Sequence, residues 1–432
     1  DMKNIIEYIK DKSYYLLGGI VIVIILLIII NACSNSSGGY DKIEQKMVNA
    51  AKNYYASHEK NLPKEENGTV KVTINTLIEA ELLKEVKDPK NKDQDCSGYV
   101  EVTKVGKEYS YTPFLVCKGN YEPKYLTDIV KSSKQDEYGN GVYEMGGEYV
   151  YRGDDVKNYV SFNNDLYRII GVFDENSHGV KGKYLIKLIM ADQLYAGSWG
   201  VYNTTNTSGT YSSYKNDWTG NTTGVKANAN VLLNEFFYNK TDTSTTYGSC
   251  SNWTYYSSNN NYKTFSCSDI IGHGIDSSLR DYIQEVTWYL KGYNSISYSK
   301  QNFYLCERGL STDTTNCMSA NSGAYDATTT ANIGLIYVSD YLYASSYFAD
   351  ASTTIANSGY YGNKNWLFKG YEWTITPSAN NASYAFNVSS YSNVRNFYTD
   401  FSYGVRPTFY LKSNVNVTGG SGTFDNPYTL SM

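Results

Sequence analysis

The sequence predicts an α+β protein with a hydrophobic N-terminal membrane helix, a small α+β unit and a larger α+β unit rich in loops. An unbroken apolar run before residue 31 predicts the membrane helix. Apolar residues at helical spacing, followed by a strand pair, predict the small unit. Short β-branched and aromatic segments between turn residues, with few helical patterns, predict the larger unit. A chain of 432 residues has room for two or three such domains.

Residues 1–33 are expected to be a signal or membrane anchor. A helix over residues 14–33 would be about 30 Å long, which matches the hydrocarbon core of a bilayer. A buried core helix is the alternative, but residues 20–30 are apolar on every face of a helix. Lysines precede the run, so the positive-inside rule keeps the N-terminus in the cytoplasm. We therefore expect a cell-membrane protein whose C-terminal part is extracellular.

The end of the hydrophobic run resembles a lipobox. Ala32 precedes Cys33, which would be lipidated after signal cleavage, and residues 34–40 would then form a flexible linker. Asn31 is unusual at its position in such a motif. An uncleaved transmembrane anchor, in which Cys33 has no role, is the alternative. Both alternatives make the membrane a partner of the N-terminus.

The chain has seven cysteines, and those after Cys33 form three pairs of near neighbours: Cys96 with Cys117, Cys250 with Cys267, and Cys306 with Cys317. Exported thiols favour disulfides. Hairpins centred at residues 106–107 and near residue 259 would place the first two pairs opposite each other. Zinc is the alternative, but the C-x2-C spacings typical of zinc sites do not occur. We therefore predict three local disulfides and no metal.

Composition argues against several classes of function. The net charge is −5 and no Lys/Arg cluster appears in the exported part, so no nucleic-acid partner is expected. The three histidines (His58, His178 and His273) stand in separate contexts, and H-E-x-x-H, G-x-S-x-G and P-loop motifs are missing. We therefore predict neither an enzyme nor a cofactor. The alternative, an enzyme acting on envelope polymers, would need a pair of carboxylates in a cleft.

Residues 41–121 are expected to form the small unit. Apolar and aromatic residues recur at helical spacing in its first part: Ile43, Met47, Ala50 and Tyr54. A second helical pattern runs from residue 77 to residue 86, and the hairpin between Cys96 and Cys117 completes the unit. A helix leading from a membrane segment into a small sheet resembles the head of type IV pilins and pseudopilins. The hydrophobic segment lacks the pilin processing pattern, so we interpret the unit as a spacer.

Residues 122–140 are expected to be a linker, and residues 141–432 a larger domain. Strand-like segments open this domain: residues 149–153, 158–162, 166–172 and 184–189, of which the last two are expected to pair. The helical patterns within it are residues 228–238 and 277–290. The rest consists of short strands and long Ser/Asn/Gly loops.

A succession of segments in the larger domain resembles the C-type lectin-like fold: residues 166–171, 232–237, 334–341, 372–377 and the Gly-x-Arg-Pro run 404–407. It is similar in particular to the bacterial branch related to the formylglycine-generating enzyme and to retroelement-diversified variable proteins. The resemblance implies a small twisted sheet with two helices and a ligand surface built from long loops. The catalytic cysteine pair of that enzyme branch and the calcium motifs of sugar-binding lectins have no counterpart here. Asn216-Asp217-Trp218 only has the residues of one calcium motif in the wrong order.

Two residues of this C-terminal region are interpreted as structural. Arg406 is expected to brace neighbouring loops through carbonyl groups or a carboxylate, and Trp373 is expected to be a core residue.

The binding face is predicted between residues 376 and 404, where Asn, Ser and Tyr dominate. The expected contact residues are Asn380, Asn381, Tyr384, Asn387, Tyr391, Asn393, Arg395, Asn396, Tyr398 and Asp400. Tyr384, Tyr391 and Tyr398 would be the anchors, because tyrosine supplies contact area at low entropic cost. Residues fit for burial would hold the segment in place: Ala385, Phe386, Val388, Val394 and Phe397. A merely solvated loop is the alternative, since residues 202–214 have a similar composition.

These observations predict a cell-surface anchored ligand-binding protein, of adhesin or receptor type, with a C-type lectin-like recognition domain. Its ligand would be an extracellular protein or glycan. The alternative is a pilin-like structural component of a surface filament or envelope layer. A soluble binder should remain monomeric, whereas a structural component should assemble.

Overall fold

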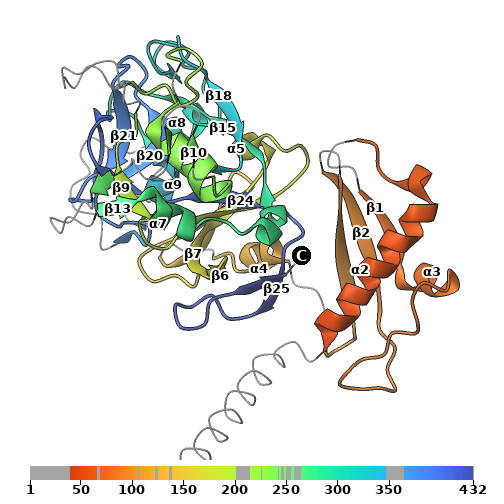
Figure 1. The fold of residues 1–432 in the computed structure, drawn as a ribbon. Coiled ribbons are helices and arrows are strands. Elements are labelled where there is room, and N and C mark those ends of the chain that lie inside the picture. Colours follow the sequence, from red (N-terminus) through yellow and green to blue (C-terminus); the bar gives the residue numbers. More distant parts are fainter. Residues whose placement is uncertain are drawn as a thin grey trace, which may run out of the picture. The chain divides into compact units, whose positions relative to one another are not determined.

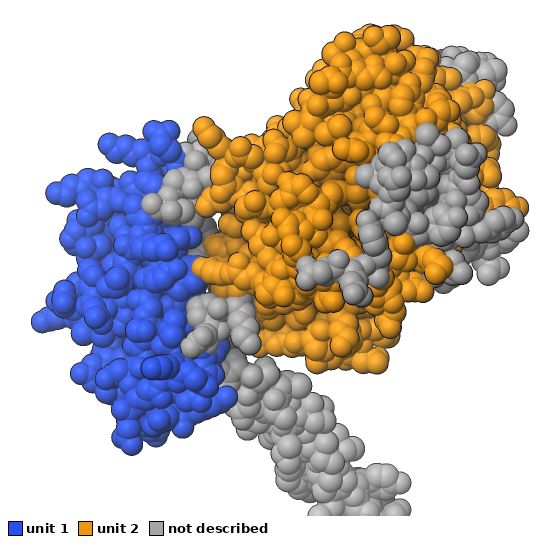
Figure 2. Space-filling view, turned by 180° about the vertical axis from the view of Figure 1, so that it is seen from behind, with its two compact units in different colours: residues 1–123 blue, residues 124–432 orange. Residues whose placement is uncertain are grey.

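The computed structural model describes residues 39–65, 69–105, 108–121, 125–135, 139–200, 215–224, 226–241, 243–244, 248–249, 254–256, 264–346 and 364–431. The chain divides into two compact units, Asp1–Pro123 and Lys124–Met432, which Figure 2 shows in different colours. Both units combine helices and strands, so the predicted α+β class is confirmed.

The first unit packs one long helix, α2 (Tyr40–Ser57), on a three-stranded antiparallel sheet of order β1–β2–β3 (Figure 1). The strands are β1 (Thr69–Thr73), β2 (Ser97–Val105) and β3 (Glu108–Val116). Met47 and Ala50 of the predicted helical stripe are buried, whereas Ile43 and Tyr54 are half-buried. Burial of this stripe against the sheet forms the core of the unit.

The second helix of this unit, α3 (Ile74–Glu79), begins and ends earlier than residues 77–86, which the sequence predicted. It begins early because Thr73 caps it: Oγ1 of Thr73 accepts a hydrogen bond from the Thr76 backbone N–H at 3.1 Å. It ends early because Glu81 adopts a left-handed backbone conformation with φ of 58°. A short 3-10 helix, η1 (Glu59–Asn61), follows α2.

The predicted hairpin and its disulfide are both present in the first unit. Val105 pairs with Glu108 across the turn, and Ser97 pairs with Val116 at the open end. The next residue on each strand is a cysteine, and Cys96 and Cys117 are disulfide-bonded with 4.4 Å between their Cα atoms. The Cys306–Cys317 disulfide is confirmed as well. Cys250 lies outside the described residues, so its pairing with Cys267 stays a prediction.

The second unit contains two larger sheets. The first follows the order β14–β24–β8–β7–β5–β4, with β19 also paired to β24 and β6 to β7. Its strands are β4 (Gly141–Met145), β5 (Glu148–Arg152), β6 (Tyr159–Phe162), β7 (Asp165–Phe173), β8 (Leu185–Met190), β14 (Ile283–Gln284), β19 (Ile333–Gly334) and β24 (Thr408–Leu411). The second sheet follows the order β22–β21–β20–β23–β9. Its strands are β9 (Tyr195–Gly197), β20 (Glu372–Pro377), β21 (Tyr384–Val388), β22 (Val394–Tyr398) and β23 (Tyr403–Val405).

The strands that open this unit agree with the sequence analysis. The four predicted segments correspond to β5, β6, β7 and β8, and the expected pairing of the last two occurs, with Ile169 opposite Leu188. Strand β8 is buried along its whole length, and it lies between β7 and β24 in the middle of the sheet.

The two predicted helices of the larger unit have different outcomes. Residues 228–238 are helical, as α6 (Asn228–Val231) continued by the π-helix η3 (Leu232–Tyr238). The helix predicted over residues 277–290 is wrong. Only a 3-10 helix, η5 (Ser277–Tyr282), forms there, and β14 and β15 (Val286–Tyr289) follow. Val286, Trp288 and Leu290 are buried at every second position, which is the period of a strand.

The interval predicted as a linker, residues 122–140, contains the helix α4 (Leu126–Ser132). Leu126 and Val130 of this helix are buried in the core of the second unit, so this part of the interval belongs to that unit. In the part of the chain that the structure describes, no helix is long and apolar enough to cross a membrane. The anchor predicted at residues 1–33, including Cys33, lies outside that part.

Shorter elements complete the second unit. The helices are α5 (Glu175–His178), α7 (Cys267–Gly272), α8 (Lys300–Cys306) and α9 (Val338–Tyr343). The two-stranded pairs are β10 (Thr243–Ser244) with β11 (Gly248–Ser249), β12 (Thr254–Tyr256) with β13 (Thr264–Ser266), β15 with β18 (Thr328–Ala331), β16 (Lys291–Gly292) with β17 (Met318–Ser319), and β25 (Asn416–Gly419) with β26 (Thr429–Ser431).

Candidate functional site

The segment predicted as the binding face is a β-hairpin at one edge of the five-stranded sheet. β21 and β22 pair from Tyr384 opposite Tyr398 to Val388 opposite Val394. The expectation of a long loop is therefore corrected: much of the segment is strand, and the turn of the hairpin spans residues 389–393. The turn is closed by a hydrogen bond from the Ser389 backbone N–H to the Asn393 carbonyl oxygen at 2.8 Å.

Four of the five apolar residues predicted to hold the hairpin are in the core, and the fifth, Phe397, is only half-buried. Ala385, Phe386, Val388 and Val394 are each no more than 1% exposed. The ring of Phe386 packs edge-to-face on Phe303 of α8, with 5.1 Å between the ring centroids. The buried residues of the hairpin therefore anchor its backbone and hold the neighbouring polar residues in place.

The structure separates the predicted contact residues by their exposure. Asn380, Asn381 and Tyr391 are exposed, and Tyr391 leads with 53% of its surface accessible. The half-buried residues are Tyr384, Asn393, Arg395, Asn396, Tyr398 and Asp400. Asn387 is only 1% exposed, because it faces the interior from the middle of β21. Asn387 therefore does not belong to the accessible surface.

The three predicted anchor tyrosines are not equivalent. Tyr384 and Tyr398 form an edge-to-face pair with 4.4 Å between their ring centroids. A hydrogen bond between their side chains, followed by burial, raises the pKa of Tyr384 to about 12. Tyr391 lies in the turn, with the guanidinium of Arg395 5.9 Å from its ring centroid. The pair therefore supports the strands, and Tyr391 is the most accessible aromatic group of the hairpin.

Asn216 fixes the base of the hairpin, a role that the sequence analysis missed. Its Nδ2 donates hydrogen bonds to the carbonyl oxygens of Ser378, Asn381 and Tyr384 at 3.2, 3.0 and 2.6 Å. Its backbone N–H donates to the Ala382 carbonyl oxygen at 2.7 Å. The one signal in the sequence is that Asn216 opens the Asn-Asp-Trp run noted for its composition.

The next two residues of that run are structural as well. Oδ1 of Asp217 accepts the Gly220 N–H at 3.1 Å, and Oδ2 accepts those of Thr222 and Thr223 at 3.1 and 2.8 Å. The ring of Trp218 packs against Trp199 with 5.1 Å between centroids. Asp217 thereby folds the loop that follows Asn216, and its carboxylate is occupied by backbone donors.

The second unit also has a polar groove of about 360 Å³. It lies between the η3 helix and the edge strand β18, and amides and hydroxyls dominate its lining: Thr219, Asn221, Lys226, Asn230, Asn234, Tyr238, Asn239, Glu285, Thr329, Thr330, Ala331 and Asn332. Such groups match the hydroxyls of a polar ligand. The sequence analysis did not find this groove, because its residues come from segments that are distant along the chain.

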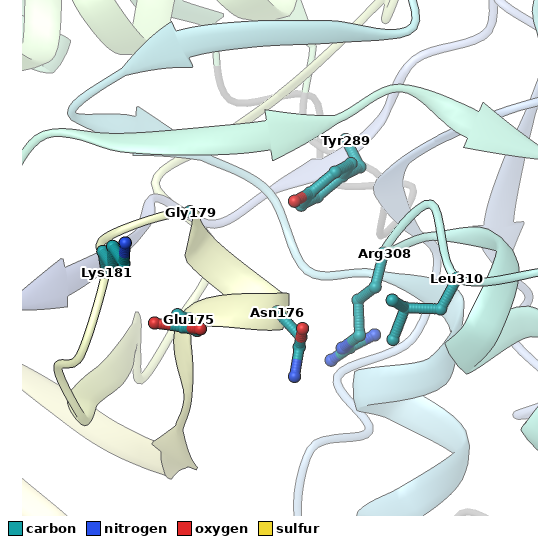
Figure 3. A pocket seen from close by; sticks show the side chains of 7 residues that line it. All are labelled: Glu175, Asn176, Gly179, Lys181, Tyr289, Arg308 and Leu310. Carbon is teal, nitrogen blue, oxygen red and sulfur yellow. The ribbon is translucent and has the colours of Figure 1, made fainter.

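A smaller pocket, of about 270 Å³, has the buried side chain of Arg308 in its wall. Figure 3 shows its lining: Glu175, Asn176, Gly179, Lys181, Tyr289, Arg308 and Leu310. Nε of Arg308 donates a hydrogen bond to Ser177 Oγ at 2.6 Å, and Nη1 donates one to Ser339 Oγ at 2.9 Å. Nε and Nη1 of this cation are therefore bonded by the protein itself.

Arg308 belongs to a cluster of buried charges. Its Nη2 lies 3.7 Å from Oδ1 of Asp340, and Oδ2 of Asp340 accepts a hydrogen bond from Nζ of Lys187 at 2.5 Å. Glu148 accepts from Ser177 and from the Tyr304 hydroxyl. Burial raises the pKa of Glu148, and it lowers the pKa of Lys187.

Glu307 is a fifth buried charged residue next to this cluster. Its carboxylate accepts the backbone N–H groups of Val338 at 2.9 Å and Ser339 at 3.0 Å, and it also bonds to the Thr376 hydroxyl. Burial raises the pKa of Glu307 to about 7. These three carboxylates lie in the core and are held by named donors, which is the arrangement of structural groups rather than of a carboxylate pair open to substrate.

No group of three or more His, Cys, Asp or Glu side chains that could hold a metal occurs among the described residues. Comparison of the chain with protein-family models, with curated proteins and with solved structures found no match. The C-type lectin-like fold and the pilin-head-like spacer therefore stay inferences from the sequence.

Proposed function

We propose that this chain is a cell-surface anchored ligand-binding protein of adhesin or receptor type. In this proposal the N-terminal segment holds the chain in the membrane, the first unit is a spacer, and the second unit is a C-type lectin-like recognition domain. The observation that carries it is the edge hairpin, in which exposed Tyr391 and neighbouring amides stand on residues that are buried almost completely.

Such a hairpin suits recognition because little order has to be created on binding. The buried apolar residues of the hairpin, the hydrogen bond from Ser389 to Asn393 and the hydrogen bonds of Asn216 already fix the backbone. A preorganised surface avoids much of the entropic cost of association. Tyrosine adds a large contact area with few rotatable bonds, so Tyr391 is the expected centre of the contact.

The chemistry of the hairpin favours a polar ligand without strong charge. Its surface groups are mainly amides and hydroxyls, with one cation, Arg395, and one half-buried acid, Asp400. We therefore propose an extracellular protein or glycan as the ligand. A structural component of a surface filament or envelope layer is the competing proposal, and it predicts that the purified ectodomain assembles.

The first experiment uses residues 39–432, so that Tyr40 keeps its hydrogen bond to Asp88 at 2.8 Å. The soluble chain is screened on arrays of glycans and of surface proteins, and its mass in solution is measured by light scattering. A monomer that binds a defined ligand supports the proposal. Concentration-dependent polymers without a ligand would favour the structural component.

The second experiment tests whether the ligand binds at the hairpin. Tyr391→Ala is expected to weaken binding of the ligand returned by the screen by about thirtyfold, since a central aromatic contact is worth about 2 kcal/mol. Tyr184→Ala is the matched control, because Tyr184 is 39% exposed on the same unit but lies outside the hairpin. Binding of both variants within about threefold of the parent would move the contact away from the hairpin.

A further inference from the structure

The ion pair between Lys187 and Asp340 lies in the centre of the second unit. Lys187 is on β8, where it pairs with Gly171 of β7 on one side and Tyr410 of β24 on the other. Asp340 is on α9, 153 positions further along the chain. Nζ of Lys187 and Oδ2 of Asp340 are 2.5 Å apart, and both side chains are 0% exposed.

Aromatic rings surround this pair. The Nζ atom of Lys187 lies 4.4 to 5.7 Å from four ring centroids, those of Tyr337, Trp288, Tyr410 and Phe173. Burying two opposite charges in such surroundings costs free energy, because each charge loses its hydration. Burial accordingly lowers the pKa of Lys187. This lowering favours the neutral amine, which is the form of Lys187 that can attack a carbonyl carbon.

The two oxygens of Asp340 have different surroundings. Oδ2 accepts hydrogen bonds from Lys187 and from the Tyr337 backbone N–H, at 2.9 Å for the latter. Among the described residues Oδ1 is buried without a hydrogen-bond donor, and the Arg308 guanidinium lies 3.7 Å from it. Negative charge that develops on Oδ1 would therefore face a fixed cation, which is the arrangement that stabilises an oxyanion.

We propose that Lys187 and Asp340 become joined by an intramolecular amide bond within the folded chain. The carbon Cγ of Asp340 is the electrophile, Nζ of Lys187 is the nucleophile, and Oδ2 leaves as water. The contact brings the groups together as in an intramolecular reaction, which removes most of the entropic barrier to attack.

The step is balanced without a co-reactant. The Lys187 ammonium gives one proton to Oδ2 of Asp340, and the neutral Nζ then forms a bond to Cγ, which places negative charge on Oδ1 opposite Arg308. A second proton moves from Nζ to Oδ2, the bond from Cγ to Oδ2 breaks, and water departs. The third hydrogen stays on the amide nitrogen. No atom is oxidised or reduced.

The product is a covalent link between the central strand β8 and the helix α9. It closes a long segment of chain, so it restricts the unfolded state in the way that a disulfide over a long loop does. Unlike a disulfide, the link persists under reducing conditions. This inference concerns the core of the unit and does not depend on ligand binding.

The test is peptide mapping of the reduced and denatured wild-type chain. We expect a branched tryptic peptide that contains both Lys187 and Asp340, is lighter than its two parts by one water, and is not cleaved after Lys187. Lys240 and Asp276 are the internal control, because they form an ion pair at the surface at 2.8 Å and should appear in separate linear peptides. Linear peptides cleaved after Lys187 as the main form would overturn the proposal.

A variant confirms the assignment. In Lys187→Arg the positive charge remains but the nucleophilic amine is lost, so the Asp340 peptide should become linear and the loss of water should disappear. A branched Asp340 peptide in this variant would show that another amine is attached, and it would overturn the assignment to Lys187. The wild-type mapping does not require the variant to fold.

Discussion

Arg406 and Glu372 form a buried two-point contact in the second unit. Nε of Arg406 donates to Oε1 of Glu372 at 2.9 Å, and Nη2 lies 2.7 Å from Oε2. The same Nη2 donates to the Leu367 carbonyl oxygen at 2.6 Å. The contact joins the residue after β23 to the first residue of β20, and both strands belong to the sheet that carries the hairpin. The interpretation of Arg406 as a brace is therefore confirmed, and Trp373 is in the core as expected.

The first prediction concerns this contact. Arg406→Met should lower the free energy of unfolding of the second unit by about 3–5 kcal/mol, because it leaves the Glu372 carboxylate buried without its cation. Chemical denaturation followed by tryptophan fluorescence measures the change. Lys369→Met is the control, since it removes an exposed partner of Asp192 and should have a small effect. Equal losses in the two variants would contradict the buried contact.

Features set by local spacing could be predicted from the sequence. The position of Cys96 and Cys117, one residue beyond a hairpin centred at residues 106–107, follows from counting along two strands. Burial of Ala385, Phe386, Val388 and Val394 in the β21–β22 hairpin follows from their apolar side chains. In contrast, residues 277–290 contain apolar residues that fit both periods, and tertiary pairing of Val286 with Ala331 selected the strand.

Contacts between distant segments could not be predicted in this way. Lys187 stands in an otherwise apolar strand, and nothing in the sequence relates it to Asp340, which is 153 positions away. Asn216 bonds to residues more than 160 positions later. Such partners are specified by the topology of the sheets, which a single sequence does not reveal.

The second prediction concerns the cysteines. Replacing Cys96 and Cys117 together by Ala should lower the free energy of unfolding of the first unit by about 2–4 kcal/mol, because the unfolded chain becomes less restricted. The second unit should keep its own transition, since the bridge lies within the first unit. Calorimetry of residues 39–432 measures both. A shift confined to the second unit would contradict the assignment.

The third prediction concerns the remaining pair of cysteines. Non-reducing peptide mapping should find Cys250 linked to Cys267, besides the two disulfides that the structure shows. The two residues are near neighbours in sequence, and the proposed export of the chain would favour their pairing. Alkylation of either cysteine before reduction would show free thiols and contradict the prediction. The Cys306–Cys317 peptide serves as the positive control.

The fourth prediction concerns the support of the hairpin. Asn216→Ala should cost about 1–3 kcal/mol, because carbonyl groups of Ser378, Asn381 and Tyr384 lose a buried donor. The loss should be local, so amide hydrogen exchange should accelerate in β21 and β22 before it does in β7 and β8. Asn176→Ala is the control, since Asn176 is an exposed amide far from the hairpin in sequence. Uniform acceleration across both sheets would contradict a local role.

The last prediction concerns pH and His178. The ring is 0% exposed, its Nδ1 accepts the Val180 N–H at 3.1 Å, and its Nε2 lies 3.1 Å from the Phe173 carbonyl oxygen. The ring is therefore neutral, with Nε2 as donor and Nδ1 as acceptor. Burial lowers the pKa of His178 from 6.5 to about 4, because the loss of hydration of the charged ring outweighs its favourable interactions with the Phe173 carbonyl, Asp174 and Glu175.

The sign of the effect follows from proton binding. Between pH 6.5 and about 4 the unfolded chain binds a proton at His178 and the folded chain does not, so this residue lowers stability as the pH falls through that window. The total loss is about 3 kcal/mol at 1.36 kcal/mol per pKa unit. His178→Gln keeps a donor and an acceptor but does not titrate, so its stability should depend less on pH over this window. His58→Gln, in the first unit, should leave the second transition unchanged. Denaturation curves at pH 4.5, 5.5 and 6.5, within the window of about 4 to 6.5, measure how the free energy of unfolding changes with pH. An equally steep change in His178→Gln would assign the pH dependence to other groups.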